Sequence, residues 1–189
     1  DGNFSLHGLM GFDMHGKTAG IIGTGKIAKI LIQILRGFGM NVLAYDLYPD
    51  YNFAREHQVV YCTLDELYHS SDIISLHCPL TEQTKYLIND YSISKMKDGV
   101  MIINTGRGQL IHTNALIEGL KTKKVGYAGL DVYEEEEPYF YEDKSDKIID
   151  DDTLARLLSF NNVIVTSHQA FFTKAESRSL VNEVAVGRV

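Results

Sequence analysis

Short apolar runs alternate with stretches of helical periodicity along almost the whole chain. The apolar runs predict strands at residues 18–22, 41–45, 59–61, 72–76, 100–104, 125–132 and 162–166. Periodicity and capping residues predict helices at residues 25–36, after Pro49, after Thr63, near 92–96 and at 113–121. The run at 100–104 lacks polar alternation, which is typical of a parallel strand covered by helices on both faces. The pattern predicts an α/β fold with a doubly wound parallel sheet.

Details of the pattern predict the faces and ends of these helices. In the first helix we interpret one group of apolar residues as the buried face: Ile27, Ile30, Leu31, Ile34 and Leu35. Gly37 and Gly39 are expected to end it. Two capping boxes are predicted, Thr63 with Glu66 and Thr173 with Glu176. Residues 134–152 carry ten acids against two lysines, which predicts a long surface loop.

Composition narrows the class of protein. A chain of 189 residues is expected to form one domain, and no apolar run is long enough to cross a bilayer. The net charge of −7 argues against a nucleic-acid surface, which needs clustered Lys and Arg. Cys62 and Cys78 fit a reducing cytoplasm as buried hydrophobic residues, with a metal ligand or a reactive thiol as alternatives. No cluster with metal-ligand spacing accompanies them, and the missing initial Met indicates a piece of a longer chain.

The first strand runs into a glycine turn with the chemistry of a dinucleotide site. Gly23 permits a tight turn, Gly25 allows close approach of a pyrophosphate, and Ala28 lets the helix pack closely on the strand. Such turns often only connect a strand to a helix. Here Asp46 follows about 20 residues later at the end of the second strand, where a carboxylate can accept hydrogen bonds from a ribose.

Five polar residues fall at or just after predicted strand ends: Asp46, His77, Arg107, Asp131 and His168. Ligands of parallel sheets bind at the carboxyl ends of the strands. Arg107 can take a carboxylate bidentately, or it can tie loops together through backbone carbonyls. His168 can be a hydrogen-bonded structural residue or, paired with an acid, a proton donor.

Taken together, the motifs resemble those of the D-isomer-specific 2-hydroxyacid dehydrogenases over essentially all 189 residues. The matching segments are residues 23–28 with Asp46, 77–81, 104–108, 129–136 and 167–171. Residues 140–145 and 168–171 are similar to segments of the fermentative D-lactate dehydrogenases. The resemblance implies a Rossmann-type NAD-binding domain with NAD as its cofactor. Ala28 stands where many members have Gly, and Gly106 where Ser is common.

The resemblance also implies residue roles. Arg107 binds the substrate carboxylate and carbonyl, His168 is the proton donor, and Glu136 supports His168. Glu136 is chosen from residues 134–137 because the family's acid lies five residues beyond the aspartate that matches Asp131. The implied cofactor-binding residues are Gly23, Gly25, Lys26, Ile27, Asp46, Cys78, Pro79, Thr84, Thr105, Gly106, Arg107 and Asp131.

The implied activity is NAD-dependent interconversion of a 2-keto acid such as pyruvate with its D-2-hydroxy acid, in a cytoplasmic homodimer. The family builds its active site with a second domain, so residues 1–189 are expected to be one NAD-binding domain cut from a longer enzyme. Two alternatives stay open: an NAD-sensing module like related corepressors, and a folded fragment that binds NAD without catalysis. No metal, nucleic acid or membrane partner is expected.

Overall fold

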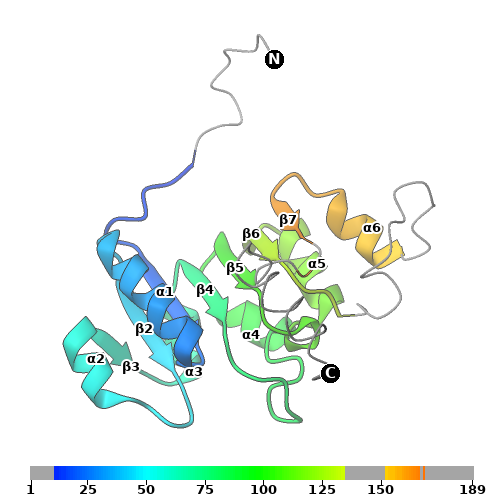
Figure 1. Ribbon diagram of the computed structural model, residues 1–189. Coiled ribbons are helices and arrows are strands. Elements are labelled where there is room, and N and C mark those ends of the chain that lie inside the picture. Colours follow the sequence, from blue (N-terminus) through cyan, green and yellow to red (C-terminus); the bar gives the residue numbers. More distant parts are fainter. Residues whose placement is uncertain (1–10, 135–151, 167, 169–189) are drawn as a thin grey trace, which may run out of the picture.

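A seven-stranded parallel sheet organises the computed structural model, which describes residues 11–134, 152–166 and 168 (Figure 1). The strand order is β3-β2-β1-β4-β5-β6-β7, and every pairing is parallel. The strands are β1 Thr18–Ile22, β2 Asn41–Tyr45, β3 Val59–Tyr61, β4 Ile73–Leu76, β5 Val100–Asn104, β6 Val125–Leu130 and β7 Val163–Val165. This order confirms the predicted doubly wound sheet, with its switch point between β1 and β4.

Helices cover the sheet on two faces. They are α1 Lys26–Gly37, α2 Tyr51–His57, α3 Leu64–Ser70, α4 Asp90–Lys95, α5 Thr113–Lys121, α6 Asp152–Leu158 and a 3-10 turn, η1, Gly108–Leu110. Residues of α1 and α2 share one hydrophobic cluster, while residues of α3 to α6 share another. At β5 the described helices cover only one face, and Met101 and Ile103 on the other are half-buried. None of the described helices is long and apolar enough to cross a membrane.

The predicted elements agree with these bounds to within a few residues, with two omissions, the turn η1 and helix α6. Helix α6 was not predicted, because its seven residues adjoin the acid-rich stretch that reads as a loop. The capping box of α3 is confirmed: the Thr63 hydroxyl accepts from the Glu66 N–H, and the Glu66 carboxylate accepts from the Thr63 N–H. The second predicted box, and most of the predicted acidic loop, lie outside the described residues.

The predicted buried face of α1 is confirmed at Leu35 and wrong at Ile27, Ile30 and Ile34. Ala28, Ile32 and Leu35 are the buried residues, while Ile27 and Ile30 are 73% and 61% exposed. The glycine turn fixes the rotation of the helix, because the small Ala28 side chain must face the sheet for close packing. The remaining apolar residues are thereby turned away from the core.

The packing of α3 on β1 depends on a residue without a side chain. A Cβ atom on Gly20 would lie 2.3 Å from Ser71 Oγ and 2.6 Å from Leu67 Cδ2. Both neighbours are fully buried, and the Ser71 hydroxyl donates to the Leu67 carbonyl at 2.6 Å. A methyl group therefore cannot enter without moving α3 away from the sheet.

We expect Gly20→Ala to lower the free energy of unfolding by about 1–3 kcal/mol, the usual cost of overpacking a core. Gly37→Ala is the matched control, since nothing lies within 4 Å of its Cβ position at the end of α1. It should be neutral or stabilise by about 0.5–1 kcal/mol. Urea denaturation of both variants measures the difference, and equal stabilities would contradict the packing of α3 on Gly20.

Candidate functional site

The carboxyl ends of β1 and β4 meet at Gly23. Its φ is +90°, and a Cβ atom there would lie 2.6 Å from the Cys78 backbone nitrogen. The Gly23 N–H donates to the Tyr45 carbonyl at 2.8 Å, and the His77 N–H donates to the Ile22 carbonyl at 2.7 Å. Both the left-handed conformation and the close approach require glycine, so this turn is fixed by the sequence.

An open groove of about 700 Å³ begins beside this turn. Helix α1 starts there with Gly25 as its N-cap, no side-chain cap and no acid in its first turn. The Gly25 Cβ position has no neighbour within 4 Å, and Lys26 and Ile27 line the groove. Uncapped N–H groups, the positive end of the helix dipole and an ammonium make this a place for phosphate groups.

A second pocket of about 210 Å³ lies at the end of β2. Gly23, Asp46 and Thr84 line it, and Cys78 and Pro79 line both this pocket and the groove. The two spaces are therefore neighbours across one loop. The Thr84 hydroxyl donates to the Pro79 carbonyl at 2.7 Å and helps to shape that loop. An apolar pocket with one carboxylate fits a nucleoside.

Asp46 is held by donors from the glycine turn. Its Oδ2 accepts from the Thr24 N–H at 2.6 Å and from the Thr24 hydroxyl at 2.8 Å, while Oδ1 accepts from the Tyr48 N–H at 2.9 Å. Burial alone would raise the pKa of Asp46, but the donors of Tyr48 and Thr24 outweigh it and lower the pKa. The carboxylate is thus charged, and one loop orients it toward the pocket. Sequence reasoning did not assign a role to Thr24, and its position between Gly23 and Gly25 was the only signal in the sequence.

Thr105, Gly106 and Arg107 form the turn that follows β5. The buried Asn104 side chain shapes this turn: its Oδ1 accepts from the Gly106 N–H at 3.0 Å, and its Nδ2 donates to the Arg107 carbonyl at 2.9 Å. Arg107 itself is exposed and lines the groove. Its guanidinium donates to the neighbouring Gly106 carbonyl at 2.9 Å. Among the described residues its guanidinium ties no two loops together, so both interpretations of Arg107 stay predictions. Asn104 is a second residue that sequence reasoning missed.

Asp131 and His168 lie together at the ends of β6 and β7. The His168 N–H donates to the Asp131 carbonyl at 2.8 Å, and His168 has a φ of +53°. The buried Asp131 carboxylate accepts from the Thr166 hydroxyl. These bonds place His168 on the carboxyl edge of the sheet, the edge that also carries Arg107.

The structure says less about the remaining predicted residues, which are Glu136, His77 and the two cysteines. Glu136 lies outside the described residues, so its role stays a prediction. His77 Nε2 is 2.9 Å from Ser75 Oγ, and burial lowers the pKa of His77. Both cysteines are half-buried and free, and burial raises the pKa of each thiol. The described residues contain no group of three His, Cys, Asp or Glu that could hold a metal ion.

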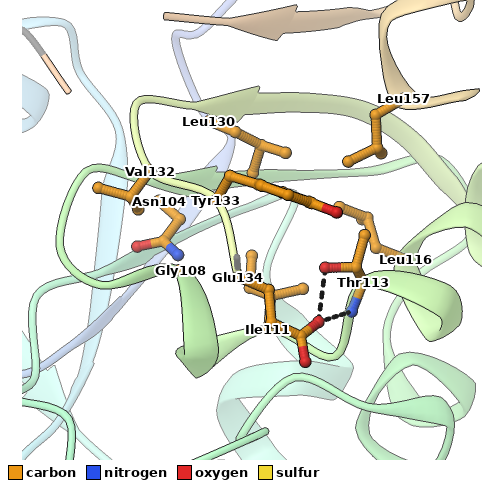
Figure 2. Close-up of a pocket in the computed structure, with 10 residues that line it drawn as sticks. All are labelled: Asn104, Gly108, Ile111, Thr113, Leu116, Leu130, Val132, Tyr133, Glu134 and Leu157. Atoms are coloured by element: carbon orange, nitrogen blue, oxygen red, sulfur yellow. Dashed lines mark hydrogen bonds between the residues drawn. The ribbon is translucent and has the colours of Figure 1, made fainter. Parts of the chain in front are cut away.

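Glu134 is the glutamate of residues 134–137 that the structure describes. Figure 2 shows its carboxylate beside Thr113, whose N–H and hydroxyl donate to Oε2 at 3.0 and 2.7 Å. Its Oε1 accepts from the Tyr86 hydroxyl at 2.5 Å. Burial raises the pKa of Glu134, but the donors of Tyr86 and Thr113 outweigh it and lower the pKa. This acid is engaged with α5 and a neighbouring loop.

The geometry as a whole fits a dinucleotide. An uncapped helix N-terminus faces the larger groove, and a carboxylate lines the adjoining pocket. The groove between Asp46 and Arg107 is lined by six residues of the predicted cofactor-binding set: Lys26, Ile27, Cys78, Pro79, Thr105 and Gly106.

Comparison with known proteins identifies the relatives of the chain. The sequence model described as "D-isomer specific 2-hydroxyacid dehydrogenase, NAD binding domain" matches residues 1–170. The D-lactate dehydrogenase of Escherichia coli (strain K12) is 51% identical over 186 residues, which are 98% of this chain and 56% of that protein. The chain thus spans about half the length of the curated relatives it matches.

Solved structures give the same result. The structure titled as the pyruvate reductase of Chlamydomonas reinhardtii has a TM-score of 0.86 and 44% identity, covering 91% of this chain and 52% of that chain. The D-lactate dehydrogenase from Lactobacillus jensenii, solved with NAD⁺, has a TM-score of 0.85 and 35% identity. That match covers 96% of this chain and 54% of the Lactobacillus protein.

We expect the protein to bind NADH more tightly than NADPH, because Asp46 would face the additional 2′-phosphate of NADPH with a like charge. Asp46→Asn keeps the shape and removes this charge. It should narrow the ratio of the two affinities roughly tenfold, or about 1.4 kcal/mol. Asp50→Asn is the matched control, because Asp50 is the N-cap of α2 and Asn is an equally good cap. Fluorescence titration with both cofactors measures the ratio, and equal affinities in the wild type would contradict the role of Asp46.

Proposed function

The chain belongs to the D-isomer specific 2-hydroxyacid dehydrogenase family, and from this premise we propose that the complete protein interconverts a 2-keto acid and its D-2-hydroxy acid. The observation that carries the proposal is the position of Arg107 and His168 at the ends of β5 and β7, on the edge that holds the dinucleotide groove. Pyruvate is the proposed keto acid, supported by relatives named D-lactate dehydrogenase and pyruvate reductase.

Arg107 binds the substrate in this proposal. Its guanidinium is exposed at the groove, and its single hydrogen bond within the described residues leaves other donors for a ligand. A planar guanidinium can hold a carboxylate through two parallel bonds and polarise the adjacent carbonyl. The Asn104 amide fixes the turn beneath it, so the direction of the side chain is set by a buried residue.

His168 supplies the proton in this proposal. A bound nicotinamide cofactor carries the hydride to or from the 2-carbon. Reduction also requires a proton at the keto oxygen, and a protonated imidazole at the end of β7 can donate it. In the reverse direction the neutral imidazole takes the hydroxyl proton. Glu136 completes the set by stabilising the imidazolium.

We expect Arg107→Lys in the complete protein to lower kcat/KM for pyruvate. An ammonium cannot reproduce a two-point contact with carboxylate and carbonyl, and losing one such contact costs about 2–4 kcal/mol, or roughly 30- to 1000-fold. Steady-state kinetics measure the loss, and thermal denaturation checks the fold. The control is Arg36→Lys, because Arg36 donates to the Met40 carbonyl on the far end of α1. Near-normal turnover by folded Arg107→Lys would contradict the proposed role.

The complete protein is a homodimer in this proposal, and α1 provides the support. Ile30, Ile34 and Phe38 are all more than half exposed and follow one line along the helix. An apolar stripe of about 12 Å can cover the same stripe of a second copy across a two-fold axis, which is the commonest symmetry of soluble oligomers.

We expect Ile34→Glu to convert the dimer to a monomer, because the interface would bury two like charges. Gln33→Glu is the control, since residue 33 is also exposed on α1 but lies off the stripe. Sedimentation velocity of the complete protein measures the oligomeric state. A monomeric wild type, or a dimer that survives Ile34→Glu, would contradict the proposed interface.

A further inference from the structure

The loop that carries Arg107 is paired with the loop that follows β4. The Tyr86 N–H donates to the Gln109 carbonyl at 2.8 Å, and the His112 N–H donates to the Ile88 carbonyl at 2.8 Å. An isolated parallel bridge between Ile88 and residue 111 continues the pairing. Residues 105–112 and 86–88 therefore form one backbone unit at the carboxyl edge of the sheet.

Glu134 joins this unit to the end of β6. Its carboxylate receives the Tyr86 hydroxyl on one oxygen, and the N–H and hydroxyl of Thr113 on the other. Tyr86 lies on the first loop of the unit, and Thr113 begins α5 directly after the second loop. The N-cap residue of α5, His112, makes no side-chain cap of its own. Glu134 thus supplies the cap from a different strand end.

The backbone around Glu134 also presses directly on the arginine loop. A Cβ atom on Gly108 would lie 1.9 Å from the Tyr133 carbonyl oxygen and 2.6 Å from the Glu134 nitrogen. Gly108 is buried and follows Arg107 in the chain. The cavity beneath, lined by Glu134 and Gly108 among others, holds only about 10 Å³ (Figure 2). The two segments therefore have almost no space in which to shift separately.

A plain helix cap is the simpler interpretation of Glu134, and the chain contains one for comparison. Glu66 Oε2 accepts from the Thr63 N–H at 2.9 Å and from the Thr63 hydroxyl at 2.7 Å, almost the geometry that Glu134 has with Thr113. Glu66 caps α3, which begins after β3. None of the hydrogen bonds of the Glu66 cap within the described residues involves the loop of Arg107. The two glutamates differ in what their caps are attached to.

We propose that Glu134 is a positioning residue for Arg107, which sets the guanidinium at the groove by clamping the arginine loop between α5 and residue 86. This inference rests on the proposed function of Arg107. Glu134 contacts neither substrate nor cofactor in this role. It acts by holding the arginine loop at Thr113 directly and at Gln109 through Tyr86, while the Gly108 backbone is pressed against the backbone of residues 133–134.

The test compares Glu134→Ala, Glu134→Gln and Glu66→Ala in the complete protein. Glu134→Ala should raise KM for pyruvate and lower kcat/KM up to about 100-fold, the scale of a displacement near 1 Å in an active site. KM for NADH should change much less than KM for pyruvate, because the N-terminus of α1 and the Asp46 pocket, which make up the rest of the proposed NADH site, do not include Glu134. Glu134→Gln should restore most of the activity, since an amide oxygen can accept from Thr113 and its NH₂ can donate to the Tyr86 hydroxyl.

Glu66→Ala serves to separate positioning from stability. It should lower the melting temperature about as much as Glu134→Ala does, and leave KM for pyruvate unchanged. In a double-mutant cycle, Glu134→Ala should cost little once Arg107→Lys is present, because the clamp then has nothing to position.

Three outcomes overturn the inference. They are a Glu134→Ala variant with the kinetics of Glu66→Ala, an effect on KM for NADH as large as that on KM for pyruvate, and full additivity with Arg107→Lys. If Glu134→Ala does not fold, normal kinetics of Tyr86→Phe, which removes one arm of the clamp, overturn it as well. A complete protein that fails to reduce pyruvate, or an Arg107→Lys variant of normal activity, would instead overturn the proposed function.

Discussion

The close approach of β1 and β4 at Gly23 is the constraint on which the site depends. The order of the strands reverses between β1 and β4. The chain therefore leaves these two strand ends toward helices on opposite faces of the sheet. The gap between them stays narrow because Gly23 has neither a side chain nor a conventional φ. The start of α1 therefore shares one groove with the ends of β4 and β5. A larger residue would separate the uncapped N–H groups from the turn that carries Arg107.

The carboxylates at the carboxyl edge of the sheet accept hydrogen bonds from uncharged N–H and hydroxyl groups. The basic side chains at this edge therefore remain available for an anionic ligand. Asp46 is satisfied by N–H and hydroxyl groups of Thr24 and Tyr48, and Glu134 by Tyr86 and Thr113. The described ion pairs lie elsewhere, for example between Lys97 and residue 72. Lys26 and Arg107 therefore have no carboxylate among their described partners, and anionic ligand groups meet no competing ion pair in the groove.

Most of the fold and the cofactor edge could be predicted from the sequence, because strand ends of a parallel sheet converge whatever the packing details. Apolar periodicity alone predicts the wrong rotation of α1, since Ile27 and Ile30 lie on its exposed side. The contact of Ala28 with the strand, which the glycine turn also predicts, decides which side is buried. Helix α6 has only seven residues and adjoins the acid-rich stretch of residues 134–152, so its helical periodicity cannot be recognised in the sequence. Residues 134–137 are identical in type, so the sequence could not predict that Glu134 bonds to Thr113 and Tyr86.

The exposure of Arg107 means that the proposed reaction requires further protein to cover this edge of the sheet. An arginine–carboxylate contact in water contributes roughly 0–1 kcal/mol, whereas the same contact in a site that excludes water is several times stronger. Arg107 and Thr105 are exposed at a groove that is open to solvent. The fold described here fixes the direction of these groups, through Asn104 beneath the turn and Glu134 beside it. Exclusion of water has to come from chain that covers this edge, so orientation and desolvation are supplied by different parts of the proposed enzyme.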